Sequence, residues 1–174
     1  RQSRFRFDSR TPTDWGQLKT RIEGDFFGTG GNERFSNSNS WRLRHAWGSL
    51  GPVLAGQTWT TFMDQDTWAS TVDFFGPVGV EFIRAAQIRY STGLAEGLSL
   101  DLAVENPEMQ VRQLNAAGTA AATNTGVVDT LPDFVAALRY RDSWGAVNLS
   151  GVGRHFNHDT GITQVSSAGW GFHA

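Results

Sequence analysis

Polar and apolar residues alternate with a period of two along most of the chain, in short segments. In one of them, Leu98, Leu100 and Leu102 alternate with Ser99 and Asp101. Such alternation is typical of a β-strand with one apolar and one polar face. No segment has helical periodicity, so the expected fold class is all-β. The pattern predicts eight strands and the start of a ninth, at residues 3–9, 18–27, 41–47, 53–62, 82–90, 98–106, 134–141, 146–154 and from 167 onward.

The connectors between these strands alternate in length, and both kinds are rich in turn-forming residues. This alternation predicts an up-and-down antiparallel meander with one tight rim and one elaborated rim. We expect residues 1–174 to form a single segment without a domain boundary, and the uncharged stretch 113–128 to be a mobile surface loop. The short connectors are 11–16, 49–52, 92–97 and 142–145, and the long ones are 28–40, 63–79, 107–132 and 155–166.

Aromatic residues gather at both ends of the predicted strands, around a band of smaller apolar residues. Such belts favour a transmembrane β-barrel, because amphipathic rings are stable at the two lipid–water boundaries. A transmembrane helix is excluded, since the longest unbroken apolar run has only five residues, Phe134 to Leu138. Arg84 falls on the predicted lipid face, where a charge is costly near the middle of the bilayer. One belt, near the short turns, contains Trp15, Trp47, Tyr90, Tyr140 and Trp144, and the other contains Phe26, Trp41, Phe62, Phe82 and Phe134.

The polar faces of the predicted strands carry mostly arginine. They hold eleven basic and five acidic residues, an excess of six positive charges in a chain whose net charge is -2. A basic lumen selects for anions, and the planar guanidinium group suits carboxylates. The competing interpretation is that these charges pair across strands and only brace the wall. The net charge gives no support for nucleic-acid binding.

Few residues suggest any other chemistry. The absence of Cys excludes disulfides and thiolate metal sites. His155 and His158 are only a weak metal pair, and Ser150 with His155 is a hydrolase candidate by residue type alone. We therefore expect no enzymatic activity, no metal and no cofactor. The loop 63–79 carries three aspartates, and it either folds into the lumen or caps the mouth; they are Asp64, Asp66 and Asp73.

Three stretches carry a family resemblance: RQSRFRFDSRTPTDWGQLKTRIEGDFFG, RLRHAWGSLGPVLAGQTWTTFMD and LPDFVAALRYRDSWGAVNLSGVGRHF. They resemble the DcaP-like family of Gram-negative outer-membrane porins, from Arg1 to about Phe156. The resemblance implies a homotrimer of 16-stranded barrels in the bacterial outer membrane, in contact with its lipid, that takes up small anionic and often dicarboxylic solutes. The positions that match the family's arginine ladder are Arg42, Arg44, Arg89, Arg139 and Arg141, and strand phase adds Arg4, Arg6, Lys19 and Arg21 as pore-lining residues.

The chain corresponds to about half of such a barrel. It begins with Arg1 rather than Met and lacks the family's first strand and later half, so we expect a processed or truncated chain. Two other hypotheses stay open. One is a closed eight-stranded barrel with a structural or adhesive role, although the start of a ninth strand argues against it. The other is a soluble β-barrel that binds an acidic ligand.

Overall fold

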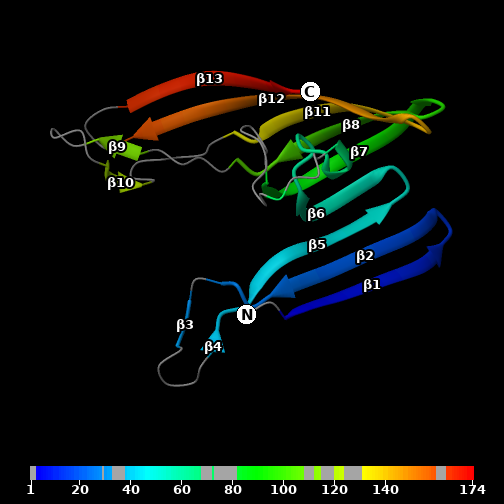
Figure 1. Cartoon of the computed structure of the whole chain (residues 1–174), viewed down its shortest axis with the longest axis horizontal. Coiled ribbons are helices and arrows are strands. Elements are labelled where there is room, and N and C mark those ends of the chain that lie inside the picture. The colour runs from blue at the N-terminus through cyan, green and yellow to red at the C-terminus, as the bar shows by residue number, and fades with distance from the viewer. Residues whose placement is uncertain are drawn as a thin grey trace.

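Nine antiparallel strands form one sheet in which every strand pairs with its neighbours along the chain (Figure 1). The computed structural model describes residues 3–28, 30–32, 38–67, 72, 82–107, 112–114, 120–123, 131–159 and 164–174. The all-β meander is therefore confirmed. In order, the strands are β1 (Arg4–Thr13), β2 (Gly16–Asp25), β5 (Arg42–Leu50), β6 (Val53–Trp59), β7 (Arg84–Ala95), β8 (Leu98–Glu105), β11 (Asp133–Asp142), β12 (Gly145–Asp159) and β13 (Gln164–His173).

Two-residue turns close one rim of the sheet, at the right of Figure 1. They lie at 14–15, 51–52, 96–97 and 143–144, so the strands extend further into the predicted turns than the pattern indicated. Gly51 and Gly97 adopt positive φ angles of 56° and 71°, which favour glycine and allow such tight reversals. A tight rim opposite an elaborated one is the arrangement that the connector lengths predicted.

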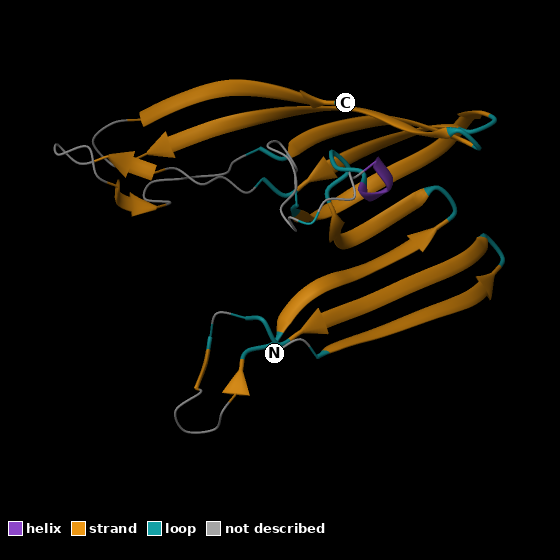
Figure 2. Ribbon diagram, in the orientation of Figure 1, coloured by secondary structure: helices purple, strands orange, loops and turns teal. Residues whose placement is uncertain are grey.

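The opposite rim carries the long connectors and two small ribbons (Figure 2). β3 (Gly31–Asn32) pairs with β4 (Ser38–Asn39), and β9 (Arg112–Leu114) pairs with β10 (Ala120–Thr123). Part of the stretch 113–128, expected to be a mobile surface loop, forms the ribbon of β9 and β10, and residues 115–119 and 124–128 lie outside the described residues. The connector predicted at 155–166 was wrong, because β12 and β13 continue their pairing through polar residues as far as Asp159 and Gln164.

Helical structure among the described residues is limited to a single 3-10 turn, η1 (Gln65–Thr67). Within the part of the chain that the structure describes, no helix has the length and apolar character needed to cross a membrane.

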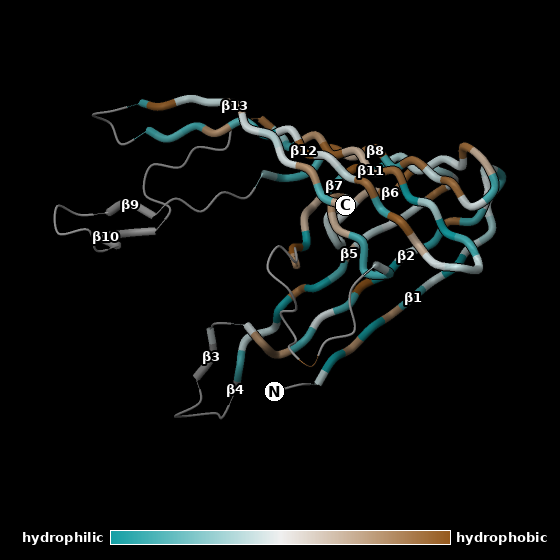
Figure 3. Tube along the Cα trace, turned by 45° about the horizontal axis from the view of Figure 1, so that its top comes forward, coloured by the Kyte–Doolittle hydropathy of each residue, from teal (hydrophilic) through white to brown (hydrophobic). Residues whose placement is uncertain are grey.

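The two faces of the sheet differ sharply in polarity, and their exposure is the reverse of that in a soluble protein. On one face, large apolar side chains are open to the surroundings: Ile88 is 64% exposed and Phe134 61%. On the other face, Asp25, Glu105 and Asn148 are buried. Figure 3 shows the resulting alternation of hydropathy along the strands. This is the pattern of a wall with lipid on one side and a polar lumen on the other.

A β-bulge in β5 changes the predicted phase of that strand. Glu23 pairs with His45 whereas Gly24 pairs with Leu43, so Arg44 is an extra residue on β5. His45 and Trp47 therefore lie on the polar face, and their predicted place on the apolar face was wrong. Period-two reasoning fails beyond a bulge, because one inserted residue moves every later side chain to the opposite face.

The phase predicted for β6 was wrong as well. Leu54 is buried on the polar face, where it is the register partner of Arg89. Thr58 is also buried there, and its hydroxyl lies 3.0 Å from Nδ1 of His45. β6 is rich in apolar and small residues on both faces, so alternation alone gave little information about its orientation.

Three aromatic rings form a cluster on the apolar face at the long-connector rim. Phe26 packs edge-on against Trp41 with ring centroids 5.4 Å apart, and Phe5 lies 6.2 Å from Phe26. Gly24 makes room for this cluster, because a Cβ atom there would lie 2.0 Å from the Trp41 ring. At the other rim, Tyr140 and Trp144 stay together, with ring centroids 6.0 Å apart.

Candidate functional site

Residues 60–67, which follow β6, fold back onto the polar face of the sheet; we call them the docked segment. Thr61 is completely buried, and Met63 and Asp64 are less than 10% exposed. Residues 63–67 of the aspartate-bearing loop therefore lie against the polar face, and the rest of the predicted loop, Val72 apart, lies outside the described residues. Asp64 and Asp66 belong to the docked segment, whereas Asp73 lies outside the described residues.

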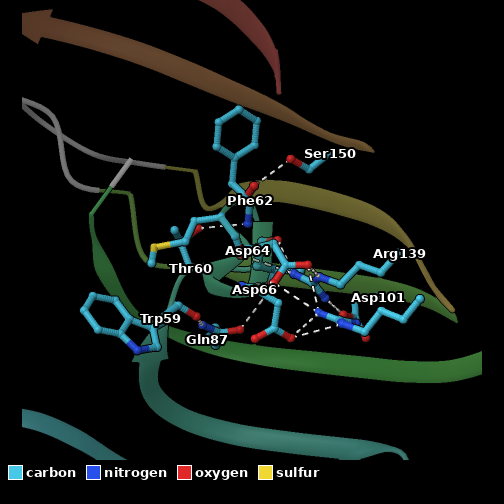
Figure 4. A network of polar contacts seen from close by, with 12 residues as sticks. Trp59, Thr60, Phe62, Asp64, Asp66, Gln87, Asp101, Arg139 and Ser150 are labelled. Atoms are coloured by element: carbon cyan, nitrogen blue, oxygen red, sulfur yellow. Dashed lines mark hydrogen bonds and ion pairs between the residues drawn. The ribbon is translucent and has the colours of Figure 1, made fainter. Parts of the chain in front are cut away.

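Uncharged and acidic groups of the sheet hold the backbone of the docked segment (Figure 4). The Glu105 carboxylate accepts hydrogen bonds from the Thr61 amide and the Thr60 hydroxyl, both at 2.6 Å. The Thr61 hydroxyl donates to Oε1 of Gln87 at 2.9 Å, and the Ser150 hydroxyl donates to the Phe62 carbonyl at 2.6 Å. A buried loop needs such partners, since each unsatisfied backbone group costs about 1–3 kcal/mol.

Two of the predicted ladder arginines hold the charged end of the docked segment. Arg139 donates to the Thr61 carbonyl at 2.8 Å, lies 3.5 Å from Asp64 and also pairs with Asp101 on β8. Arg141 donates to Asp64 at 2.8 Å and to Asp66 at 3.0 Å. The sequence placed both arginines on the polar face but gave no sign that carboxylates of the loop neutralise them.

Apart from Arg89, the other predicted pore-lining residues lie on β1, β2 and β5, and together with Arg10 and the carboxylates beside them they form a group that we call the basic wall. Its seven basic residues face only three carboxylates, Asp8, Glu23 and Asp25. Asp8 is shared by Arg6 at 2.5 Å and Arg21 at 2.7 Å. The basic members are Arg4, Arg6, Arg10, Lys19, Arg21, Arg42 and Arg44.

The charged groups at the long-connector end of the basic wall are closely paired with one another. Asp25 is 1% exposed and accepts two hydrogen bonds from Arg42, at 2.7 and 2.9 Å. Arg44 donates to Glu23 at 2.8 Å and reaches Asp25 at 3.3 Å. Arg4 lies 3.6 Å from Glu23. Here five charged groups form one network, so cross-strand bracing and an excess of positive charge exist together.

The positive excess is smaller than the sequence predicted, and it is distributed unevenly. With the docked segment included, the described polar face carries eleven basic and eight acidic residues, because Asp64, Asp66 and Asp133 join it. The excess of six was therefore too high. The basic wall has four more basic than acidic residues. The remaining face has four basic against five acidic, the basic ones being Arg89, Arg139, Arg141 and Arg154.

Arg89 lies beside the docked segment and differs from its neighbours. Its Nε atom is buried and has no hydrogen-bond partner among the described residues. The side chain lines a hollow next to the docked segment, together with Ser91, Ser99 and Arg139. The structure thus brings Arg89 close to Arg139 and Arg141, and β6 separates its strand from the basic wall.

By register Arg84 belongs to the apolar face, as the alternation predicted, but its partner Trp59 also packs edge-on against His45 of the polar face, with ring centroids 5.4 Å apart. Arg84 is the partner of Trp59 at the start of β7, and its guanidinium carbon lies 3.7 Å from the centre of the Trp59 ring. Phe82 flanks the same group at 5.4 Å. The position at the long-connector rim and the aromatic partners reduce the cost of this charge.

Alternation separates the residues that suggested other chemistry. His155 and His158 are three apart on β12, so their side chains leave opposite faces of the strand. Ser150 and His155 are also on opposite faces, and each has another partner, Phe62 and Ser166 respectively. Among the residues described, no group of three potential metal-ligating side chains is close enough to hold an ion.

The fold and its reversed exposure define an outer-membrane type of β-sheet protein. A family model described as DcaP outer membrane protein matches residues 1–141, so the chain belongs to this family and is an outer-membrane protein. This location excludes the soluble binder. A search of curated proteins found no match.

Among solved structures, the chain is similar to the outer membrane channel DcaP of Acinetobacter baumannii. The TM-score is 0.73 and the sequence identity 24%, over 98% of this chain and 45% of that one. The chain therefore spans less than half the length of that channel. Its ninth strand pairs fully with β12, which does not fit a barrel closed at eight strands.

Proposed function

We propose that this chain forms part of an outer-membrane porin through which small anions, carboxylates and dicarboxylates above all, diffuse passively. The observation that carries the proposal is the basic wall, where seven basic residues face three carboxylates. Fixed charge on a low-dielectric wall concentrates counter-ions and favours their passage. Membership in a family of outer membrane proteins and the similarity to a channel support the same proposal.

In this proposal the two halves of the described polar face have different roles. The basic wall attracts the anion, and its arginines replace part of the hydration shell. The docked segment narrows the lumen, and Arg139 and Arg141 hold it in place rather than meeting the solute as free charges. Carboxylates suit the site because guanidinium groups bind them in a bidentate manner.

We also propose that the porin is a homotrimer whose apolar faces contact lipid or neighbouring subunits. Large apolar side chains on this face, such as Ile88 and Phe172, are exposed in the single chain. Either environment removes them from water. Cross-linking of the protein in detergent, followed by mass measurement, tests this state: three-subunit species are expected, and monomer alone contradicts it.

The experiment that tests the function is a reversal-potential measurement on the full protein in a planar bilayer under a KCl gradient. We expect the conductance to rise in steps. We also expect the reversal potential to be shifted from zero towards the equilibrium potential of chloride. A reversal potential on the potassium side would contradict anion preference. Stable insertion without conductance would contradict the porin itself.

A further inference from the structure

Two basic residues face each other directly near the tight rim, with no carboxylate between them. Arg10 on β1 is the register partner of Lys19 on β2, and both are exposed on the polar face. Among the described residues, none forms an ion pair with either. The nearest carboxylate along β1 is Asp8, whose two oxygens already bind Arg6 and Arg21.

Like charges in direct cross-strand positions destabilise a sheet, so this pair calls for a counter-charge. Cβ atoms of such partners are only about 5 Å apart, which lets both cationic groups reach one oxyanion. On the other side of Lys19, the register partner is Ser49 on β5, which adds a hydroxyl donor on the same face. Asp14 in the adjacent turn forms no ion pair with Arg10 or Lys19 among the described groups.

The ratio of carboxylates to basic groups falls steadily along the basic wall towards the tight rim. At the far end, Glu23 and Asp25 serve three arginines. In the middle, Asp8 alone serves two. At the tight rim the count of carboxylates is zero for Arg10 and Lys19. An anion that enters the lumen therefore meets increasingly uncompensated positive charge in this direction.

We propose that Arg10, Lys19 and Ser49 form a binding site for a small doubly charged oxyanion at the tight rim. This inference rests on the proposed porin function and gives it a specific subsite. Two adjacent positive groups match two negative charges, whereas a single halide ion leaves one of them uncompensated. The donors in this site are a guanidinium, an ammonium and a hydroxyl, all of which suit oxygen acceptors.

Sulfate is the probe for the test, with the full protein in a planar bilayer and chloride as the current carrier. Sulfate is expected to reduce the chloride current in a saturable manner. The double variant Arg10→Ser, Lys19→Ser should weaken the apparent affinity for sulfate at least about tenfold, since a charge-assisted hydrogen bond is worth about 1.5–3 kcal/mol. The exchange variant Arg10→Lys, Lys19→Arg keeps both charges and should retain the block. Equal block in all three proteins would overturn the site.

Thermal unfolding in detergent tests the same site without any current. At constant ionic strength, sulfate should raise the unfolding midpoint of the natural protein relative to chloride, and it should not do so for the double Ser variant. An equal rise in both would overturn the site. If the natural protein conducts but neither assay separates the variants, the subsite fails and the porin stands. If it does not conduct, the porin fails, and the unfolding assay alone decides the site.

Discussion

The Glu105 carboxylate on β8 accepts a hydrogen bond of 2.6 Å from the Thr61 amide. Through this bond, a residue 44 positions further along the chain holds the backbone of the docked segment. The same carboxylate accepts the Thr60 hydroxyl. Both oxygens of Glu105 are therefore committed to positioning the loop. This relationship makes Glu105 an anchor of the inward conformation.

Replacing Glu105 by Ala should release the docked segment from the wall. Two hydrogen bonds to an ionised group disappear and the Thr61 amide loses its partner, which costs about 2–4 kcal/mol locally. We expect a larger single-channel conductance with more current noise. Glu105→Gln keeps a hydrogen-bond acceptor, so its single-channel conductance should lie between those of Glu105→Ala and the natural protein. Identical conductance in all three would show that residues 60–67 do not narrow the channel.

Breaking the Arg141–Asp66 pair in a charge-balanced way separates anchoring from electrostatics. The double variant Arg141→Gln, Asp66→Asn removes the 2.9 Å ion pair and also the 2.8 Å contact of Arg141 with Asp64, but it leaves the net charge unchanged. We expect conductance to rise while the reversal potential stays within a few millivolts of the natural value. A large shift in selectivity at constant net charge would mean that Arg141 meets the permeating ion directly.

Replacing both Arg139 and Arg141 by Ser is expected to lower anion preference, because the change strips Asp64, Asp66 and Asp101 of their partners. The three carboxylates then contribute negative charge to the lumen. Adding Asp64→Asn and Asp66→Asn to this variant should restore part of the preference. Reversal potentials of the two variants measure the difference. No restoration would assign the lost preference to the arginines themselves.

Trp47 gives a direct test of the bulge in β5. The ring lies on the polar face, 5.5 Å from the Arg21 guanidinium carbon, rather than in an aromatic belt. Trp47→Phe should therefore remove fluorescence that aqueous iodide quenches and leave unchanged the fraction quenched by spin-labelled lipid. Trp144→Phe is the matched control and should do the opposite, because the exposed Trp144 ring lies 6.0 Å from Tyr140, which is on the apolar face. Loss of lipid-quenched fluorescence in the Trp47→Phe variant would contradict the bulge, because it would place Trp47 on the apolar face.

Gly24 should tolerate no side chain while Trp41 keeps its place. A Cβ atom there would lie 2.0 Å from the Trp41 ring, so Gly24→Ala must push the ring away from Phe5 and Phe26. Overpacking of this kind costs about 1–3 kcal/mol. We expect Gly24→Ala to lower the unfolding midpoint in detergent. In a protein that already carries Trp41→Ala, the same change should lower the midpoint much less. Additive losses in the double variant would contradict the proposed clash.

The alternation of residues was sufficient to predict the nine strands of the main sheet, their order and, outside β5 and β6, their two faces, because lipid and a polar lumen place opposite demands on successive residues. It failed at Arg44, where one bulged residue shifts the phase of His45 and Trp47. It also failed at β6, since Leu54 and Gly56 on the polar face are no more polar than Val53 and Ala55 on the apolar face. Both features become visible only in the pairing with neighbouring strands, and the sequence of one segment does not reveal that pairing.

The charged residues of the candidate site were mostly found from the sequence, but their partners were not. Arg139 and Arg141 were placed on the polar face by their alternation with Leu138 and Tyr140. Their contacts with the docked segment join residues more than 70 positions apart in the chain. Glu105 was seen as a polar-face charge, but its two loop hydrogen bonds required the folded structure.

The central claim is that the basic wall, rather than Arg139 and Arg141, sets the preference for anions. The most direct test compares reversal potentials of the natural protein, Arg6→Ser with Arg21→Ser, and the charge-balanced Arg141→Gln, Asp66→Asn variant under one KCl gradient. The account predicts that the first variant loses a large part of the anion preference, because the positive excess of the basic wall falls from four to two, whereas the second variant keeps it. Full preference in the Arg6, Arg21 variant together with its loss in the charge-balanced variant would contradict the account.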